Sequence, residues 1–566
     1  MKKTGMVLLA AVMLSSTIAL SPAEGKSRIY EAEKGALKGV SISTSAKGYS
    51  GSGYVTGFDE EGDAITVTVN PPKAGLYQIK IRYNASKGAK QTNIFVNGSS
   101  AGIVDFPSTN GFKEIAVTKS ILKKGANTIR LDKGWGYYDI DYFAIEKVTK
   151  EPAHPISKSL VNPDASPAAR SLMSYLVDSY GHQILSGQQD YSNVEWLQNH
   201  LDKKPAIVGF DLMDYSPSRI AYGAATTETE KAIDWDRQGG IVTFLWHWNA
   251  PKDLIDQPGK EWWRGFYTDS TTFDVQYALS HRDSEEYTLL LRDIDTIAVQ
   301  LKKLQEANVP VLFRPLHEAE GGWFWWGAKG PEPSKELYRL LYDRLTNEHQ
   351  LNNLIWVWNS VSPEWYPGDD VVDIVSYDSY PPGGDYNVQV GKYDQLLSLI
   401  KDRKLIAMTE NGAIPDPDLL ASHHADWSWF STWGTHDEKT NSLAHLKKVY
   451  NHPYVITLDE LPDIKNYPST DGAVPAAPSG IDAKPSSEKV KISWNPVTGA
   501  DSYTLLRADT VKGPCKAITS KRKDAHYTNK GLTNDQTYYY TIQAVNKAGS
   551  SASSAPIAVT PHQKNN

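Results

Sequence analysis

The sequence predicts a multidomain fold class: an all-β jelly-roll sandwich, then a (β/α)8 barrel of the TIM type, then an immunoglobulin-like β-sandwich. The chain has 566 residues, which is too long for one ordinary domain. Two stretches rich in proline and small polar residues, 149–167 and 462–480, are typical of linkers and divide it into three blocks. The outer blocks show strand patterns, and the middle block alternates strand and helix patterns.

The first 23 residues have the pattern of a secretory signal peptide. Lys2 and Lys3 precede the apolar run MVLLAAVML, and small residues follow around Ala23, the expected cleavage point. The apolar run is well short of the roughly 20 residues that a membrane-spanning helix needs. We therefore expect a secreted, extracellular mature protein.

Residues 27–148 predict the first sandwich. Short runs such as AITVTVN, LYQIKIRYN and TNIFVNG alternate with turns rich in Gly and Asn. The block opens with YEAE and closes with DIDYFAIE, so Glu31, Glu33 and Asp141 meet if the terminal strands are neighbours. Three such carboxylates suit Ca²⁺, although solvated strand residues remain the alternative.

Residues 155–465 predict the barrel. Eight runs have strand character: 182–188, 205–212, 240–248, 309–318, 353–359, 372–380, 405–412 and 454–461. Stretches between them, such as 287–309 and 334–353, space their apolar residues at helical intervals. An open doubly wound sheet is the alternative, but no Gly-rich phosphate turn supports it.

Polar residues at strand ends indicate the active site, because the carboxyl ends of barrel strands face one cleft. They are Trp246, His247 and Trp248 on the third strand, Arg314, His317 and Glu318 on the fourth, Tyr377 and Tyr380 on the sixth, and Glu410 on the seventh. A pair of carboxylates about 5 to 5.5 Å apart is what glycoside hydrolysis with retention requires.

Tryptophan is concentrated in the middle block, where 15 of the chain's 17 tryptophans lie between Trp196 and Trp433. We expect Trp323, Trp325 and Trp326 to desolvate Glu318 and to form an apolar wall around a sugar ring. A structural role in the barrel core is the alternative. The run HEAE lacks the second histidine of a zinc-protease helix, so we do not expect zinc.

Residues 475–562 predict the last sandwich, with short strands such as KVKISW and YYYTIQAVN. No catalytic pattern appears in it. Cys515 is the chain's single cysteine, so an internal disulfide is excluded. The formal net charge is −7 with both signs scattered, which argues against a nucleic-acid or membrane partner. We expect a monomer.

The middle block closely resembles glycoside hydrolase family 26 over about residues 160–460. The resemblance rests on FRPLHEAEGGWFWWG together with ILSGQQD, WHW and MTENG, in that family's order. It implies a retaining endo-β-1,4-mannanase that acts on plant β-mannan polysaccharides and needs no cofactor for catalysis. The chain departs from many members at Ala319, Glu320 and Gly434, positions that bear on how the glycone sugars are held.

The resemblance also implies roles for individual residues. Glu318 matches the acid/base and Glu410 the nucleophile. Substrate-binding positions are matched by His247 and His317, which contact the sugar, Trp323, which packs on the acid, Tyr380, which positions the nucleophile, and Trp433, a stacking platform. Tyr377 remains the alternative to Tyr380, because the phase of the sixth strand is open.

The flanking blocks have resemblances of their own. YEAE, GYSGSGYVTGF and DIDYFAIE are similar to a carbohydrate-binding module of family 35 or the related family 6. That similarity implies a structural Ca²⁺ held by Glu31, Glu33 and Asp141, and a sugar platform formed by Trp135 and Tyr137; a core position for Trp135 is the alternative. The last block resembles a fibronectin type III domain, with Trp494 and Tyr538 in its core.

The resulting expectation is a secreted, endo-acting, retaining hydrolase of internal β-1,4-mannosidic bonds in mannan, glucomannan and galactomannan. Two alternatives stay open. One is the same chemistry on β-1,3-xylan or mixed-linkage β-glucan, and the other is a non-catalytic polysaccharide-binding protein.

Overall fold

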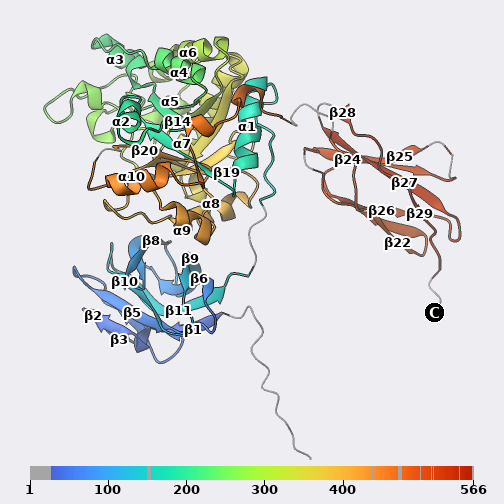
Figure 1. Cartoon of the computed structure of the whole chain (residues 1–566), viewed down its shortest axis with the longest axis horizontal. Coiled ribbons are helices and arrows are strands. Elements are labelled where there is room, and N and C mark those ends of the chain that lie inside the picture. Colours follow the sequence, from blue (N-terminus) through green and yellow to red (C-terminus); the bar gives the residue numbers. More distant parts are fainter. Residues whose placement is uncertain are drawn as a thin grey trace, which may run out of the picture. The chain divides into compact units, whose positions relative to one another are not determined.

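The computed structural model describes residues 27–563 except 150–153, 435–436, 470–474, 498, 511–512, 514 and 547–548. The predicted signal peptide, residues 1–23, lies outside the described residues. The chain divides into two compact units, Met1–Glu151 and Pro152–Asn566. Figure 1 shows the first sandwich in blue, the barrel from cyan to orange and the last sandwich in red. Within the described ranges, no helix has the length and apolar character to cross a membrane.

The N-terminal unit is a sandwich of two antiparallel sheets. One sheet has the order β3-β4-β11-β6-β9 with β1 beside β11, and the other has the order β2-β5-β10-β7-β8. The strands are β1 (Arg28–Glu31), β2 (Ala36–Lys38), β3 (Ser41–Ser43), β4 (Tyr54–Thr56), β5 (Ala64–Val69), β6 (Gly75–Asn84), β7 (Lys90–Val96), β8 (Ser99–Phe106), β9 (Lys113–Leu122), β10 (Asn127–Asp132) and β11 (Asp139–Lys147). The first and last strands are neighbours, with Glu31 opposite Tyr142.

Eight parallel strands close the central barrel. They are β13 (Gly187–Gln189), β14 (Ile207–Asp211), β15 (Ile241–Leu245), β16 (Val311–Arg314), β17 (Leu354–Asn359), β18 (Ile374–Ser379), β19 (Leu405–Asn411) and β20 (Phe430–Thr432). Most of their side chains are buried on both faces, as expected for parallel strands covered by helices. The predicted fold class, a barrel between two β-sandwiches, is confirmed.

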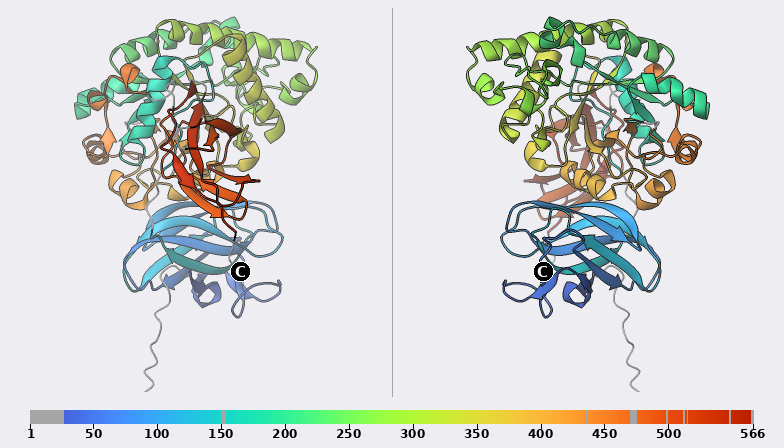
Figure 2. Two further views of the ribbon diagram at one scale, coloured as in Figure 1. Left: turned by 90° about the vertical axis from the view of Figure 1, so that its right-hand side faces the viewer. Right: turned by 90° about the vertical axis from the view of Figure 1, so that its left-hand side faces the viewer.

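Helices surround the barrel, as both views in Figure 2 show. They are α1 (Pro167–Ser179), α2 (Ser192–Leu201), α3 (Pro217–Ala221), α4 (Glu228–Arg237), α5 (Val275–Ser280), α6 (Glu285–Glu306), α7 (Pro331–Tyr342), α8 (Val390–Ile400), α9 (Pro417–His423) and α10 (Leu443–Tyr450). Between β17 and β18 the chain makes only the short 3-10 turn Pro363–Trp365 instead of a helix. The connection from the carboxyl end of β17 to the amino end of β18 therefore contains no covering α-helix.

The predicted eighth strand was wrong. Of the run 454–461, only β21 (Val455–Ile456) is a strand, and it pairs with β12 (Ile184–Leu185) in a separate two-stranded sheet. The eighth barrel strand is β20, which lies in the run WSWFSTW. Its three residues are too few to show a strand period, and both runs are equally apolar, so local pattern did not distinguish them. The correction places Trp433 directly after a barrel strand.

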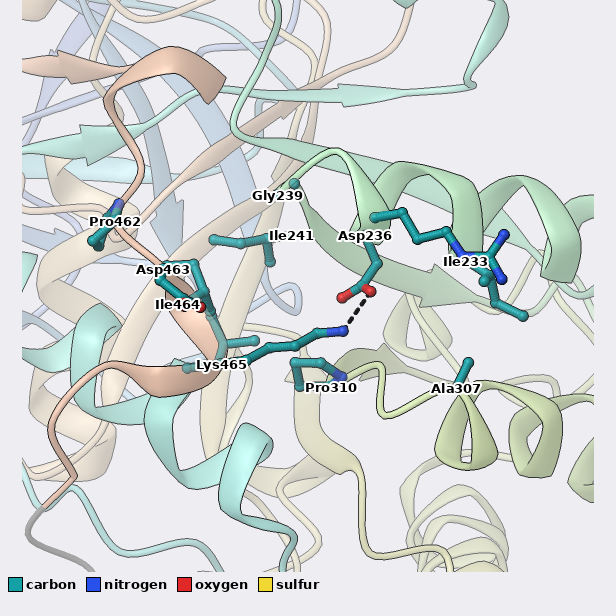
Figure 3. Close-up of a pocket in the computed structure, with 13 residues that line it drawn as sticks. Ile233, Asp236, Gly239, Ile241, Ala307, Pro310, Pro462, Asp463, Ile464 and Lys465 are labelled. Carbon is teal, nitrogen blue, oxygen red and sulfur yellow. Dashed lines mark hydrogen bonds and ion pairs between the residues drawn. The ribbon is translucent and has the colours of Figure 1, made fainter.

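After α10 and β21, the chain passes beside the amino-terminal ends of barrel strands β15 and β16. Ile464 is buried in the barrel core, and Lys465 Nζ lies 2.6 Å from Asp236 Oδ2. Figure 3 shows the pocket between this segment, the turn after α4 at Gly239, and Pro310 before β16. We call residues 462–467 the closing segment; it lies beside the amino ends of β15 and β16.

The C-terminal sandwich packs sheet β22-β23-β26 against sheet β25-β24-β27-β28, with β29 beside β27. The strands are β22 (Asp482–Ser486), β23 (Lys489–Ser493), β24 (Ser502–Ala508), β25 (Lys516–Arg522), β26 (His526–Lys530), β27 (Tyr538–Asn546), β28 (Gly549–Ser550) and β29 (Ile557–Val559). Trp494 and Tyr538 are buried between the sheets, as predicted, and Cys515 is exposed.

Candidate active site

Three carboxylates converge at the carboxyl ends of the barrel strands. Glu318 follows β16, Asp378 lies in β18 and Glu410 is the penultimate residue of β19. One oxygen of each lies within 4.8 Å of the other two. The barrel therefore brings the two predicted catalytic glutamates together, and adds an aspartate that had no predicted role.

Glu410 is held by hydrogen bonds on both oxygens. Arg314 Nη2 donates to Oε2 at 2.8 Å, and the Tyr380 hydroxyl donates to Oε1 at 2.5 Å. These bonds fix the plane of the carboxylate and stabilise its charge. A carboxylate fixed and charged in this way is suited to nucleophilic attack.

Arg314 also binds the buried Asp378, through Nη1 at 2.5 Å from Oδ2. Burial opposes the charge of Arg314, but the carboxylates of Asp378 and Glu410 outweigh it and raise the pKa of the guanidinium. Burial raises the pKa of Asp378 well above its usual range, although Arg314 opposes that shift. The guanidinium is thus a permanent positive charge between two acidic groups.

Glu318 has a different environment. Burial and then the negative charge of Glu410 raise its pKa, while Arg314 and a hydrogen bond from Trp323 act in the opposite direction. That hydrogen bond joins Trp323 Nε1 to Glu318 Oε2 at 3.0 Å. A carboxyl with a raised pKa retains a proton nearer to neutral pH, as a general acid must.

The backbone around Glu318 is unusual. Leu316 and Glu318 both have left-handed conformations, with φ of 52° and 53°. The Glu318 N–H donates to Asn359 Oδ1 at 2.9 Å, and the carbonyl of His317 accepts from Trp326 Nε1 at 2.9 Å. Positive φ in a residue other than glycine is strained and persists where surrounding contacts hold it.

Two histidines lie edge to face beside the carboxylates. His317 Nε2 is 3.2 Å from His247 Nε2, and Nδ1 of His247 is 2.6 Å from Asp211 Oδ2. Burial, then the charge of Arg314, lowers the pKa of His317 well below its usual range. His317 is therefore an uncharged hydrogen-bonding group, and Asp211 fixes the ring orientation of His247.

The tryptophans fall into two sets. Trp323 is 49% exposed beside Glu318, and Trp433 is 38% exposed with its ring 6.0 Å from that of His247. Trp325 and Trp326 are almost fully buried. This corrects the expectation that all three tryptophans after Glu318 line the sugar cleft: the turn at Ala319–Gly321 directs only Trp323 into it.

The phase of β18 distinguishes the two candidate tyrosines. Tyr377 faces outward, where Lys392 Nζ of α8 lies 5.4 Å from its ring. Tyr380 follows the strand and its hydroxyl reaches Glu410. Tyr380 is accordingly the tyrosine of the candidate site.

Sequence reasoning missed three polar residues of the site. Asp211 ends β14, Asn359 ends β17 and Asp378 lies near the end of β18. The sequence analysis also named Arg314 but assigned it no role. Each lies near the carboxyl end of a barrel strand, so a systematic list of polar residues at those ends would have found them.

Further aromatic residues lie on the loop between β15 and α5. The Phe266 ring lies 4.9 Å from His247, and earlier on this loop Trp262 stacks on Tyr222 at 4.8 Å. Trp263 and Tyr222 are each nearly half exposed. Trp262 and Trp263 lie in the run EWWRG, to which the sequence analysis gave no role.

In the N-terminal sandwich, Trp135 and Tyr137 lie on the loop between β10 and β11. Trp135 is 66% exposed and Tyr137 is 55% exposed. Their exposure excludes the core alternative for Trp135, and such rings suit stacking on a sugar face.

The predicted calcium ligands surround the backbone of Ser50–Ser52. Ser50 Oγ donates to Glu31 Oε2 at 2.8 Å and to Asp141 Oδ1 at 3.2 Å, and the Ser52 N–H donates to Glu33 Oε1 at 2.9 Å. Oε2 of Glu33 is buried without a hydrogen-bond partner. The oxygen-only set and this unpaired acceptor fit a cation, although Arg82 already pairs with Asp141.

Comparisons with known proteins agree with this architecture. The family models for glycosyl hydrolase family 26, carbohydrate binding module (family 35) and fibronectin type III domain match residues 161–460, 28–148 and 476–560. A mannan endo-1,4-beta-mannosidase of Thermothelomyces thermophilus is 52% identical over 436 residues, covering 76% of this chain and 90% of the relative. Mannan endo-1,4-beta-mannosidase B of a Piromyces species is 36% identical, covering 76% and 77%.

Among solved structures, the GH26-CBM35 β-(1,4)-mannanase of Podospora anserina is 47% identical with a TM-score of 0.58, covering 78% of this chain and 99% of that one. A ruminal GH26 endo-β-1,4-mannanase is 32% identical with a TM-score of 0.59, covering 77% and 98%. Both similarities extend beyond the length of the barrel alone.

Proposed function

The chain belongs to glycosyl hydrolase family 26, and we propose that it hydrolyses internal β-1,4-mannosidic bonds with retention, using Glu410 as nucleophile and Glu318 as acid/base. The geometry of the two carboxylates carries this proposal. Their nearest oxygens lie within 4.8 Å, close to the separation of about 5 to 5.5 Å typical of retaining enzymes. Inverting enzymes need a wider gap of about 6.5 to 9.5 Å for a water molecule.

In the first step, a Glu410 oxygen attacks the anomeric carbon and the bond from that carbon to the leaving sugar oxygen breaks. Glu318 gives its proton to the leaving oxygen, which departs as a hydroxyl. Arg314 and Tyr380 hold Glu410 in the attacking orientation. The product of this step is a covalent glycosyl ester on Glu410.

In the second step, Glu318 accepts a proton from water and the water oxygen attacks the anomeric carbon, releasing Glu410. The charge of Glu410 raises the pKa of Glu318 in the free enzyme, and esterification removes that charge. The pKa of Glu318 then falls, and the Trp323 N–H stabilises the resulting carboxylate. One residue is thereby suited to act first as acid and then as base.

The substrate class rests on the relatives, which are named as mannan endo-1,4-β-mannosidases at identities up to 52%. Plant mannan, glucomannan and galactomannan are the proposed substrates. The exposed rings of Trp323 and Trp433 beside the carboxylates support a sugar-binding cleft. The described candidate catalytic groups all come from one chain, so a single copy carries both carboxylates of the proposed mechanism.

The test is release of reducing ends from glucomannan and galactomannan, beside β-1,3-xylan and barley β-glucan. We expect rapid release from the mannans alone. Glu318→Gln and Glu410→Ala should each lower turnover by about 10³-fold or more, with unchanged thermal unfolding. Activity on xylan or glucan alone would change the substrate, and inactivity on all four would favour a binding protein.

We also propose that the protein is exported through its signal-peptide pattern and that Glu31, Glu33 and Asp141 hold a structural Ca²⁺. The unpaired, buried Glu33 Oε2 supports the ion. Added Ca²⁺ should raise the midpoint of thermal unfolding of the EDTA-treated full chain, and Glu33→Gln should reduce that rise. An equal response in both proteins would contradict this site. N-terminal sequencing of protein from culture medium tests export.

A further inference from the structure

We propose that Asn359 is a positioning residue that holds the acid/base in place and links it to the nucleophile; this rests on the proposed role of Glu318. Asn359 ends β17 and is buried. Its Oδ1 accepts the Glu318 N–H at 2.9 Å, and its Nδ2 donates to Asp378 Oδ1 at 2.9 Å. The side-chain amide of Asn359 therefore connects the backbone of Glu318 to the carboxylate of Asp378.

The bond to Glu318 acts on a single peptide plane. The carbonyl of His317 and the N–H of Glu318 belong to the same peptide group, and Trp326 binds the carbonyl while Asn359 binds the N–H. Both polar groups of this peptide bond are therefore hydrogen-bonded to side chains. The left-handed φ of 53° at Glu318 is a sparsely populated conformation that persists only where surrounding contacts hold it. Removing Asn359 leaves that conformation supported from one side only.

The opposite side of the amide leads to the nucleophile. Asn359 Nδ2 donates to Asp378, Asp378 pairs with Arg314, and Arg314 donates to Glu410. A continuous path of hydrogen bonds thus runs from the backbone of Glu318 to the carboxylate of Glu410. Asn359 is the only amide side chain in this path, and its direct bond is to the backbone of Glu318 and not to Glu410.

The amide cannot be reversed. The Glu318 N–H can only donate, so Oδ1 must face it and Nδ2 must face Asp378. Ser376 Oγ at 3.2 Å and Thr409 Oγ1 at 3.3 Å also lie around Nδ2. A smaller side chain loses the bond to Glu318, while Asp378 retains Thr409 Oγ1 at 2.8 Å.

The test compares leaving groups, because a misplaced acid slows only reactions that need a proton. Two aryl β-mannobiosides serve as substrates: 2,4-dinitrophenol leaves without protonation, and phenol requires it. For Asn359→Ala we expect kcat/KM to fall about 10²-fold on the phenyl substrate, the effect of about 1 Å of misplacement, and less than tenfold on the dinitrophenyl substrate. A residue with only a structural role would lower both values equally.

Asn359→Thr provides a second variant, since it fills more of the space and its hydroxyl cannot reach both partners; the same selective loss is expected. Ser376→Ala is the matched control, because the Ser376 hydroxyl accepts from the Asn359 amide and donates to the Trp358 carbonyl instead of to Glu318. For Ser376→Ala we expect kcat/KM to change little, and by the same factor on the phenyl and dinitrophenyl substrates. Thermal unfolding identifies the folded variants.

Glu318→Ala separates the two possible failures. If it shows no dependence on the leaving group, the proposed role of Glu318 fails. If Glu318→Ala is selective but the folded Asn359 variants lose activity equally on both substrates, the role of Asn359 is overturned.

Discussion

Glu318 and Glu410 carry the same side chain and differ in their neighbours. Glu410 receives hydrogen bonds on both oxygens from Arg314 and Tyr380. Glu318 receives one side-chain bond, from Trp323, and burial raises its pKa. The proposed division of labour between an acid and a nucleophile therefore rests on contacts made by the fold.

Trp323→Phe tests how Glu318 is tuned. Phenylalanine keeps an aromatic ring but removes the N–H that stabilises the carboxylate, so the pKa of Glu318 should rise further. The first step needs protonated Glu318, and activity is lost as pH rises through its pKa. The alkaline limb of kcat/KM on glucomannan should therefore move to higher pH. Trp494→Phe, in the C-terminal sandwich, should leave the profile unchanged; a shift of the Trp323 variant to lower pH would contradict this account.

At the scale of elements, the segment before α1 is fixed by one histidine. His154 Nδ1 lies 2.7 Å from Asp402 Oδ1, and Nε2 lies 3.1 Å from Asp426 Oδ2. The ring also packs against Tyr180, and Tyr454 faces Asp426. Burial opposes the charge of His154, but hydrogen bonds to Asp426 and Asp402 outweigh it and raise its pKa.

This pair of contacts predicts a pH-dependent contribution to stability. Because the pKa of His154 is raised by folding, its stabilisation is complete below the ordinary histidine pKa of about 6.5 and is lost as pH rises through the raised value. The gap in unfolding midpoint between wild type and His154→Ala should be largest in acid and shrink with rising pH. The exposed His182→Ala is the control. A constant gap would show that packing alone is involved.

The closing segment supports a second prediction at this scale. A chain ending at residue 469 keeps Ile464 and Lys465, whereas one ending at 461 loses both. Loss of a buried isoleucine costs about 2 to 5 kcal/mol, and Asp236 is left without its cation. The shorter chain should unfold at a clearly lower temperature and the longer one should keep the barrel's midpoint. Equal midpoints would rule out a stabilising role for the segment.

At the scale of the whole molecule, one chain joins a catalytic barrel to a module with exposed aromatic rings. Trp135 lies far from Glu318 in sequence and belongs to a different compact unit. Binding to a solid polysaccharide and cleavage of a soluble one should therefore be separable properties.

Trp135→Ala should weaken retention of the protein on insoluble mannan by about tenfold, as expected for the loss of a stacking contact worth about 1.4 kcal/mol. Activity on soluble galactomannan should remain unchanged. Ile42→Ala removes another exposed apolar side chain of the same module and is the matched control. The platform assignment fails if both variants bind equally well, and pull-down with insoluble mannan measures this.

Local pattern predicted much of the architecture. Strand runs such as 64–70 and helical runs such as 287–309 correspond to β5 and α6, because side-chain periods of 2 and 3.6 follow from backbone geometry alone. The eighth barrel strand was misplaced because β20 has three residues, too few for a period. Which segments become barrel strands, and where each strand begins and ends, depends on which segments pair in the closed sheet.

The sequence by itself determined the order of the domains, the two glutamates and their association with strand ends, because these are properties of residue type and near neighbours. Only the tertiary structure decided that Tyr380 and not Tyr377 reaches Glu410, that Trp325 and Trp326 are buried, and that Asn359 joins Glu318 to Asp378. The physical reason is that these facts depend on strand phase and on hydrogen bonds between residues from different strands, which barrel closure creates and local sequence does not encode.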